Sequence, residues 1–177
     1  MKNKITVISQ FWLIALVFTM LGVARVAVAQ DTAAKKEASD SKSSSVSAKD
    51  KTFMKKAAKG GTMEVAMGKI AEQNGQSDDV KSFGKRMVTD HGKANDELKS
   101  IAEKKGVTLP SKEPTIKWSS DKAYIDTMVK DHEKDLAEFQ EEAKNGSDPD
   151  VKKFAEDTAK VVQEHLDLAK ETQGKLK

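Results

Sequence analysis

The sequence predicts an all-α protein folded as an antiparallel four-helix bundle. Four segments of the chain repeat apolar residues at spacings of three and four, which is the period of a helix with one buried face. Two of the three connections between these segments are very short and begin at Asn74-Gly75 and Asn145-Gly146. Short connections make consecutive helices antiparallel neighbours. No segment shows the alternating pattern of a β-strand.

The first two predicted helices form one such pair. The first covers residues 49–74 and contains Gly60-Gly61, where each glycine costs roughly 1 kcal/mol relative to alanine. Two adjacent glycines therefore indicate either close contact with another helix or a local bulge. The second helix begins at Ser77, a favourable N-cap residue, and ends at Gly106.

The last two predicted helices form the other pair. The third ends at Asn145-Gly146, and the fourth has Pro149 near its first turn and runs almost to the C-terminus. Their candidate N-caps are Ser119 or Ser120 for the third helix and Ser147 or Asp148 for the fourth. The connection between the two pairs contains Leu109-Pro110 and Glu113-Pro114, which block helix formation. At about a dozen residues, it is long enough to cross the end of the bundle.

The N-terminal region has the pattern of a secretory signal peptide. Lys2 and Lys4 precede an uncharged, mostly apolar run over residues 5–23, and Ala27-Val28-Ala29 is a typical cleavage site. The sequence therefore predicts a signal peptide over residues 1–29. The alternative is an uncleaved membrane anchor, because the apolar run is close to spanning length.

Three regions follow from this pattern. Residues 1–29 are the predicted signal peptide, residues 30–49 a flexible polar linker rich in Ser, Ala, Lys and Asp, and residues 50–177 the helical domain. The exported protein is then predicted to be periplasmic or secreted. We expect no stable insertion in a membrane after cleavage, and the sequence does not support association with the outer membrane.

Composition limits the classes of partner. The chain has 31 Lys and Arg against 28 Asp and Glu, and residues 1–29 contain three of the basic residues and no acidic one. The remainder is formally neutral, which gives no basic footprint for nucleic acid. Cysteine is absent, so neither disulfides nor lipoprotein acylation can occur, and apolar burial must stabilise the domain. The sequence does not identify a protein partner.

Each predicted apolar face is interrupted once by an ionisable residue. Placed on the helices at 1.5 Å per residue, the four positions fall within one or two turns of a common level. The four residues are Glu64, His91, His132 and His165, and they include all three histidines of the chain. Because an unpaired buried charge is costly, these side chains must pair with one another or with a shared ion.

This set predicts a single metal site. Neutral imidazoles and one carboxylate suit Zn, Cu, Fe or Mn, with Glu64, His91, His132 and His165 as candidate ligands. Met87 and Met128 lie one turn before two of the histidines and would favour copper if they reached the ion, although buried methionine is more typical of core packing.

An acidic residue precedes each histidine. These residues are Asp90, Asp131 and Glu164. Neighbouring positions on a helix point about 100° apart, so they are not obvious additional ligands. They can instead accept hydrogen bonds from imidazoles of neighbouring helices.

Two other interpretations remain open. The four side chains can form a metal-free network that fixes helix register, in a non-catalytic structural or interaction module. The third interpretation is an enzyme, in which an ion with an open coordination position activates water or peroxide. Against it, the sequence has no nucleophile elbow, phosphate-binding loop or catalytic carboxylate pair. No catalytic residues are predicted.

Several motifs resemble one bacterial family. They are Ala57-Ala58-Lys59-Gly60-Gly61, Met87-Val88-Thr89-Asp90-His91, Leu109-Pro110, Met128-Val129-Lys130-Asp131-His132 and His165-Leu166. The family is a domain of unknown function commonly labelled "predicted outer membrane protein". The resemblance implies a ferritin-like helical bundle in the cell envelope and brings no activity with it.

Di-iron chemistry is not expected even for a ferritin-like bundle. Such sites use Glu-x-x-His pairs, and the residues three before the histidines are Val88, Val129 and Val162. The sequence therefore predicts an exported envelope protein that binds one transition-metal ion, in metal handling or stress tolerance. The alternative is the non-catalytic module with a metal-free Glu–His layer.

Overall fold

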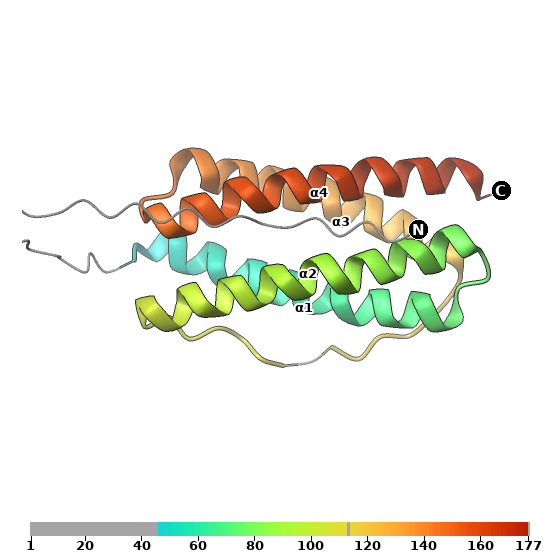
Figure 1. Ribbon diagram of the computed structural model, residues 1–177, viewed down its shortest axis with the longest axis horizontal. Coiled ribbons are helices and arrows are strands. Elements are labelled where there is room, and N and C mark those ends of the chain that lie inside the picture. The colour runs from blue at the N-terminus through green and yellow to red at the C-terminus, as the bar shows by residue number, and fades with distance from the viewer. Residues whose placement is uncertain (1–45, 113, 177) are drawn as a thin grey trace, which may run out of the picture. The chain divides into compact units, whose positions relative to one another are not determined.

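Four long helices make up the bundle in the computed structural model, which describes residues 46–112 and 114–176 (Figure 1). They are α1 (Ala48–Asn74), α2 (Asp78–Lys105), α3 (Asp121–Asn145) and α4 (Pro149–Lys175). No strand occurs within these residues, so the predicted all-α four-helix bundle is confirmed. The predicted signal peptide and all but the end of the predicted linker lie outside the described residues.

The bundle consists of two helical hairpins packed side by side. Helix α1 pairs with α2 and α3 pairs with α4, and the hairpins meet through α2 against α4 and α1 against α3. Every neighbouring pair is antiparallel (Figure 1). None of the helices in residues 46–112 and 114–176 carries an apolar stretch long enough to cross a membrane.

The connection between the hairpins runs along the bundle rather than across its end. Asp121 at the start of α3 accepts hydrogen bonds from the backbone N–H groups of Gln76 and Ser77, at 3.0 and 2.7 Å, in the turn between α1 and α2. Helices α2 and α3 therefore start at the same end of the bundle and run in the same direction. The chain must return the full length of α2 between the end of α2 and the start of α3, of which the structure describes residues 106–112 and 114–120 (Figure 1). The expectation that this link crosses the end was wrong, and the single long crossover is the connectivity of ferritin-like bundles.

The structure decides between the candidate N-caps. Ser120 Oγ accepts from the N–H of Ala123 at the start of α3, and Asp148 Oδ1 accepts from the N–H of Asp150 and Val151 at the start of α4. Ser77 occupies the N-cap position of α2 without a side-chain hydrogen bond of its own. Its backbone is held by Asp121 instead.

Glycines allow α1 and α2 to approach closely. A Cβ at Gly61 would lie 2.3 Å from Asn95 Oδ1, and one at Gly68 would lie 2.6 Å from the carbonyl oxygen of Gly84. Helix α1 continues regularly through Gly60-Gly61. Of the two possibilities that the sequence left open, the structure therefore has close helix contact and no bulge.

The core has two apolar clusters. One contains Phe53, Phe139 and Phe154, whose rings pack with centroids 5.1–6.5 Å apart. The other contains the fully buried Met87 and Met128, so both methionines pack in the core, as expected for gap-filling residues. The four interrupting polar side chains are buried but belong to neither cluster.

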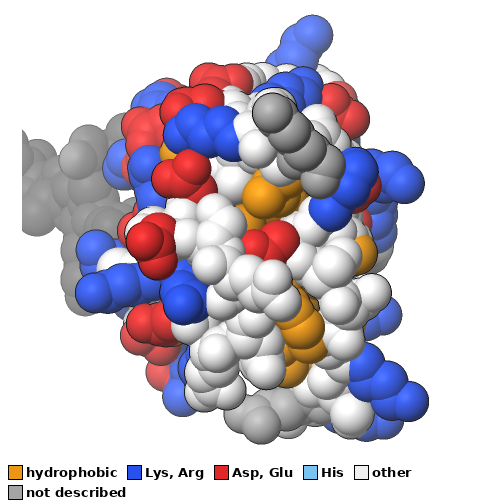
Figure 2. All heavy atoms as spheres, turned by 90° about the vertical axis from the view of Figure 1, so that its right-hand side faces the viewer, with side chains coloured by type: hydrophobic (Ala, Val, Ile, Leu, Met, Phe, Trp, Pro, Cys, Tyr) orange, Lys and Arg blue, Asp and Glu red, His pale blue; other side chains and the backbone are white. Residues whose placement is uncertain are grey.

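Charges of both signs are mixed on the surface. On the end of the bundle drawn in Figure 2, Lys and Arg side chains lie beside Asp and Glu, and no histidine is visible. Ion pairs such as Lys170–Glu133 (2.8 Å) and Lys175–Asp79 (3.2 Å) join neighbouring helices. Exposed pairs of this kind contribute little individually.

Candidate metal centre

The three histidines meet inside the bundle, one from each of α2, α3 and α4. Their ring centroids lie 5.1 Å (His91–His165), 5.4 Å (His132–His165) and 5.6 Å (His91–His132) apart. His132 and His165 are fully buried and His91 is 6% exposed. Glu64 joins them from α1 and is also buried. The structure thus brings together all four residues that interrupted the apolar faces.

The carboxyl group of Glu64 faces the Nδ1 atom of two different rings, those of His91 and His132. Its Oε2 lies 3.1 Å from His91 Nδ1, and its Oε1 lies 3.5 Å from His132 Nδ1. His132 Nδ1 is closer to the carbonyl oxygen of Met128, at 2.9 Å. A carbonyl can only accept, so His132 carries its proton on Nδ1 and leaves Nε2 as a bare lone pair.

His165 is oriented by a neighbouring helix. Its Nε2 lies 3.0 Å from Asp90 Oδ2 on α2, which also accepts from Arg86 Nε at 3.2 Å. Burial alone would raise the pKa of Asp90, but the hydrogen bonds from His165 and Arg86 lower it below its usual range. Asp90 is therefore an ionised acceptor, which places the His165 proton on Nε2 and a lone pair on Nδ1.

The remaining nitrogen of each ring has no partner. His91 Nε2, His132 Nε2 and His165 Nδ1 are buried and make no hydrogen bond with any described residue. One ligand atom from each ring can be chosen so that all three lie within 4.8 Å of one another. An ion held at about 2.0–2.1 Å by three imidazoles needs nitrogens about 3.3–3.6 Å apart, so the rings would have to draw closer than the 4.8 Å limit to bind one ion together.

The environment keeps these rings neutral. Burial lowers the pKa of His91 to about 3, and the nearby His165 and His132 contribute further. Burial also lowers the pKa of His132 to about 4 and holds the pKa of His165 below its usual range despite its bond to Asp90. Neutral imidazole is the form that binds metal ions.

Burial shifts the pKa of the Glu64 carboxyl group in the opposite direction to that of the histidines. Burial raises its pKa well above the usual range, and the charges of Asp135 and Asp131 raise it further. Its Oε1 has no hydrogen-bond partner among the described residues. A carboxylate in this position is stabilised by positive charge nearby, which a bound cation would supply.

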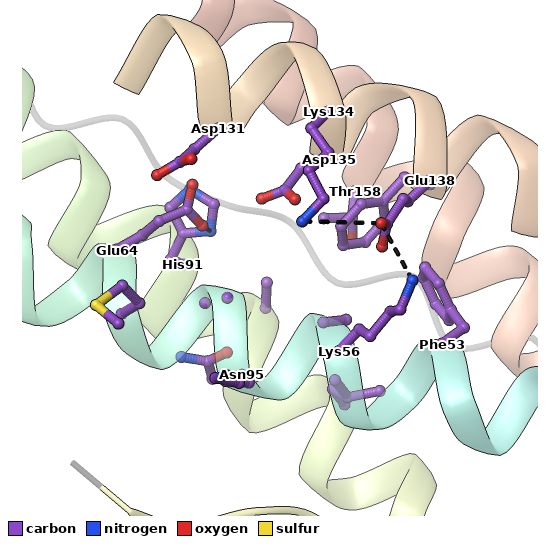
Figure 3. Close-up of a pocket in the computed structure, with 18 of the residues that line it drawn as sticks. Phe53, Lys56, Glu64, His91, Asn95, Asp131, Lys134, Asp135, Glu138 and Thr158 are labelled. Carbon is purple, nitrogen blue, oxygen red and sulfur yellow. Dashed lines mark hydrogen bonds and ion pairs between the residues drawn. The ribbon is translucent and has the colours of Figure 1, made fainter. Parts of the chain in front are cut away.

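A cavity of about 290 Å³ leads from the surface between α1 and α3 to this layer. Glu64 and His91 line it at one side, together with Asp131 and Asp135 from α3 (Figure 3). Lys56 and Lys134 lie near Glu138, which forms ion pairs with both of them. Burial raises the pKa of Asp135 to about 6.

The acidic residues that precede the histidines have different surroundings. Asp90 accepts from an imidazole of another helix, as predicted. Glu164 instead pairs with Arg86 at the surface, and Asp131 lines the cavity. The sequence reasoning missed Asp135, although it lies one turn after Asp131 and so on the same helix face.

Comparisons with known proteins agree with the fold and leave the activity open. A family model described as "Domain of unknown function (DUF4142)" matches residues 33–172. No curated protein matches the chain. Among solved structures, the chain is similar to a DUF305 fragment from Deinococcus radiodurans, with a TM-score of 0.63 and 11% sequence identity over 74% of this chain and 99% of that one. The similarity at this identity concerns the fold alone.

The family match covers most of the chain, including all four helices up to residue 172. It supports the resemblance to a family of unknown function and gives no support to the outer-membrane label. The chain belongs to the DUF4142 family of domains of unknown function.

Proposed function

We propose that this chain is an exported protein of the cell envelope, periplasmic or secreted, that binds one transition-metal ion in the bundle core and acts in metal handling or stress tolerance. The ligands are Nε2 of His91, Nε2 of His132 and Nδ1 of His165. Export rests on the signal-peptide pattern of residues 1–29.

One observation carries the metal proposal: three buried histidines from three helices each keep one ring nitrogen without a hydrogen-bond partner among the described residues, and their ligand atoms can lie within 4.8 Å of one another. Leaving a buried polar atom unpaired costs about 1–3 kcal/mol. Here the lone pairs of His132 Nε2 and His165 Nδ1 are fixed by the partners of the other ring nitrogens, so these two rings cannot donate to each other through those atoms. A cation shared by the three nitrogens removes this cost.

Glu64 takes the role of an orienting acceptor in this proposal rather than that of the fourth ligand expected from the sequence. It faces His91 Nδ1, on the edge of the ring opposite the free Nε2. Carboxylates behind metal-bound imidazoles fix ring orientation and raise ligand basicity. Glu64 and Asp90 occupy this position behind His91 and His165.

The donor set narrows the choice of ion. Three imidazoles suit Zn, Cu or Fe, whereas Mn prefers oxygen ligands. Three protein ligands around Zn commonly leave a position for water or substrate. No reaction is assigned to that position.

A metal-free structural layer is the competing function. The contact between Glu64 and His91 joins α1 to α2, and the hydrogen bond between Asp90 and His165 joins α2 to α4, without any ion. In that case the domain acts through its surface as a structural or interaction module. The three unpaired nitrogens favour the metal-binding function over this alternative.

Metal titration of the purified, untagged protein tests the proposal. We expect about one equivalent of Zn²⁺ or Co²⁺ after removal of excess metal, measured by elemental analysis. The His132→Ala variant should lose it, and a Met128→Leu variant, altered one turn earlier on the same helix, should retain it. Less than a tenth of an equivalent in the wild type would rule the function out.

A further inference from the structure

The cavity between α1 and α3 has a chemistry that the metal layer alone does not explain. It extends from the surface to Glu64 and His91 (Figure 3). Its wall on the α1 side includes Gly60, where a Cβ would meet only Asp135 Oδ2, at 3.7 Å. A glycine at this position therefore leaves open space next to the carboxylate of Asp135 on α3.

Two carboxylates in this cavity make no direct ion pair within the described residues. Asp131 and Asp135 are partly buried, and neither forms an ion pair or hydrogen bond with any residue in 46–112 or 114–176. Lys56 and Lys134 pair with Glu138 instead, although the charge of Lys134 also acts on Asp131 and Asp135. Four acidic side chains and three lysines line the cavity, and Glu138 is the acidic residue that takes up the lysine ion pairs.

Glu64 contributes a third carboxyl group to the lining of the cavity. Glu64 lines the cavity, its side chain is only 5% exposed, and its Oε1 has no hydrogen-bond partner within the described part of the chain. A buried, unpaired carboxylate oxygen beside two partly buried carboxylates is suited to a cation. Hard oxygen ligands bind such an ion more weakly than three imidazoles bind a transition metal.

The opposite side of the bundle lacks this property. A second cavity, of about 410 Å³, reaches His91 between α2 and α4. Its acidic residues nearest the histidines, Asp90 and Glu164, are both paired with Arg86. A cation approaching from that side would meet a guanidinium group and carboxylates that are already neutralised.

We propose that Asp131, Asp135 and Glu64 Oε1 form a transient cation-binding site in the α1–α3 cavity, through which the metal ion reaches the three histidines. This inference rests on the proposed metal-binding function. Asp131 and Asp135 exchange the outer water ligands of the incoming ion for carboxylate oxygens. Glu64 and His91 line the same cavity, so a carboxylate oxygen stays near the ion until it passes His91 to the facing ring nitrogens.

Loading kinetics test the route. Co²⁺ is mixed with the metal-free full-length protein in a stopped-flow instrument, and the rise of its visible absorption gives the rate. Favourable charge in a cleft raises association rates by roughly 10–10³-fold, so removing one carboxylate in Asp135→Asn should slow loading by about ten-fold. The equilibrium Kd should change much less, because release slows along the same route. Asp96→Asn, which removes the same charge from an exposed position on α2, is the control.

A second variant tests the route without changing charge. Gly60→Leu places a bulky side chain in the cavity and should also slow loading, whereas Gly174→Leu, at a position with open space around it, should not. Unchanged loading rates in both Asp135→Asn and Gly60→Leu, with one equivalent still bound, would overturn the entry route and leave the metal centre standing. Absence of Co²⁺ binding by the wild type would overturn both.

Discussion

Asp90 shows how a single side chain can set the chemistry of the metal layer. It lies next to His91 in the sequence but acts on His165 of another helix, whose Nε2 it contacts at 3.0 Å. Because it is ionised, it holds the proton on Nε2 and directs the lone pair of Nδ1 toward the other rings. A residue outside the ligand set therefore decides which nitrogen is available.

Replacing Asp90 by Asn should weaken metal binding without abolishing it. Loss of an outer-shell carboxylate typically costs about 10–100-fold in metal affinity, and we expect a loss of that size here. Competition with a chromophoric chelator measures the Kd. Glu164→Gln is the matched control, since Glu164 bonds the same Arg86 but no imidazole. Equal affinities in Asp90→Asn and wild type would show that Asp90 does not orient His165 in the metal-bound protein.

Glu142 is a second residue with an unusual environment, at the end of α3. Burial raises its pKa to about 7, and its hydrogen bond to Asp50 and the charge of Asp50 contribute. Asp50 is itself held ionised by hydrogen bonds from the backbone N–H groups of Ser147 and Asp148, which outweigh its burial and lower its pKa. The folded protein therefore keeps a proton on Glu142 that the unfolded chain releases near its ordinary pKa of 4.5.

This proton makes stability depend on pH. A raised folded-state pKa gives a contribution that is fully present below pH 4.5 and is lost as the pH rises through about 7. We expect the wild type to lose roughly 1–3 kcal/mol of unfolding free energy from this group over that range. Glu142→Gln should remove this loss, and Glu103→Gln at an exposed site should retain it. Urea denaturation at pH 5, 6, 7 and 8 provides the comparison, and parallel curves for wild type and Glu142→Gln would contradict it.

At the scale of elements, small residues decide how closely α1 and α2 pack. Gly68 and Gly84 face each other, and a Cβ on either would lie 2.6–2.7 Å from the carbonyl oxygen of the other. The obstructing atoms are backbone, which cannot move without displacing a helix. The position of Glu64 relative to His91 depends on this spacing, because the two residues lie on these two helices.

Gly68→Ala should therefore destabilise the protein although alanine favours helix formation. Overpacking costs typically about 1–3 kcal/mol, more than the propensity gain of about 1 kcal/mol. Gly92→Ala is the control: a Cβ there meets nothing within 4 Å, so only the favourable propensity term remains. Thermal unfolding followed by circular dichroism should give a lower Tm for the first variant and an equal or higher Tm for the second. A higher Tm for Gly68→Ala would mean that the helices can separate at little cost.

At the scale of the whole molecule, the three histidines come from three helices in two hairpins. An ion bound to all three links α2 of the first hairpin to α3 and α4 of the second. The interface between the hairpins includes the cavities on both sides of His91. Metal binding should therefore stabilise the assembly of the two hairpins.

Zinc should accordingly raise the Tm, and a chelator should lower it to the value of the metal-free protein. At a free concentration one hundred times the Kd, an ion that binds only the folded state adds about 2.7 kcal/mol, or a shift of several degrees. His132→Ala should show no shift. A metal-free structural layer predicts the reverse pattern, with no effect of zinc or chelator on wild type and a lower Tm for the variant.

Much of the element level could be predicted from the sequence. The helical periods, the Asn-Gly stops and the absence of strand patterns are local signals, and they gave the four helices to within a few residues. The meeting of Glu64 with the three histidines also followed from spacing, because a fixed rise per residue places each position at a height along its helix.

What only the tertiary structure decided is how groups from different helices face one another. Sequence spacing fixes height and face, but it does not fix the rotation of an imidazole ring or which of its nitrogens meets a neighbour. It therefore could not assign Asp90 to His165, turn Glu64 toward Nδ1 of His91, or show that Asp135 lines an open cavity. It also missed the lengthwise course of the connection between α2 and α3, because the direction of α3 relative to α2 depends on how the two hairpins pack, which no local signal in the connection specifies.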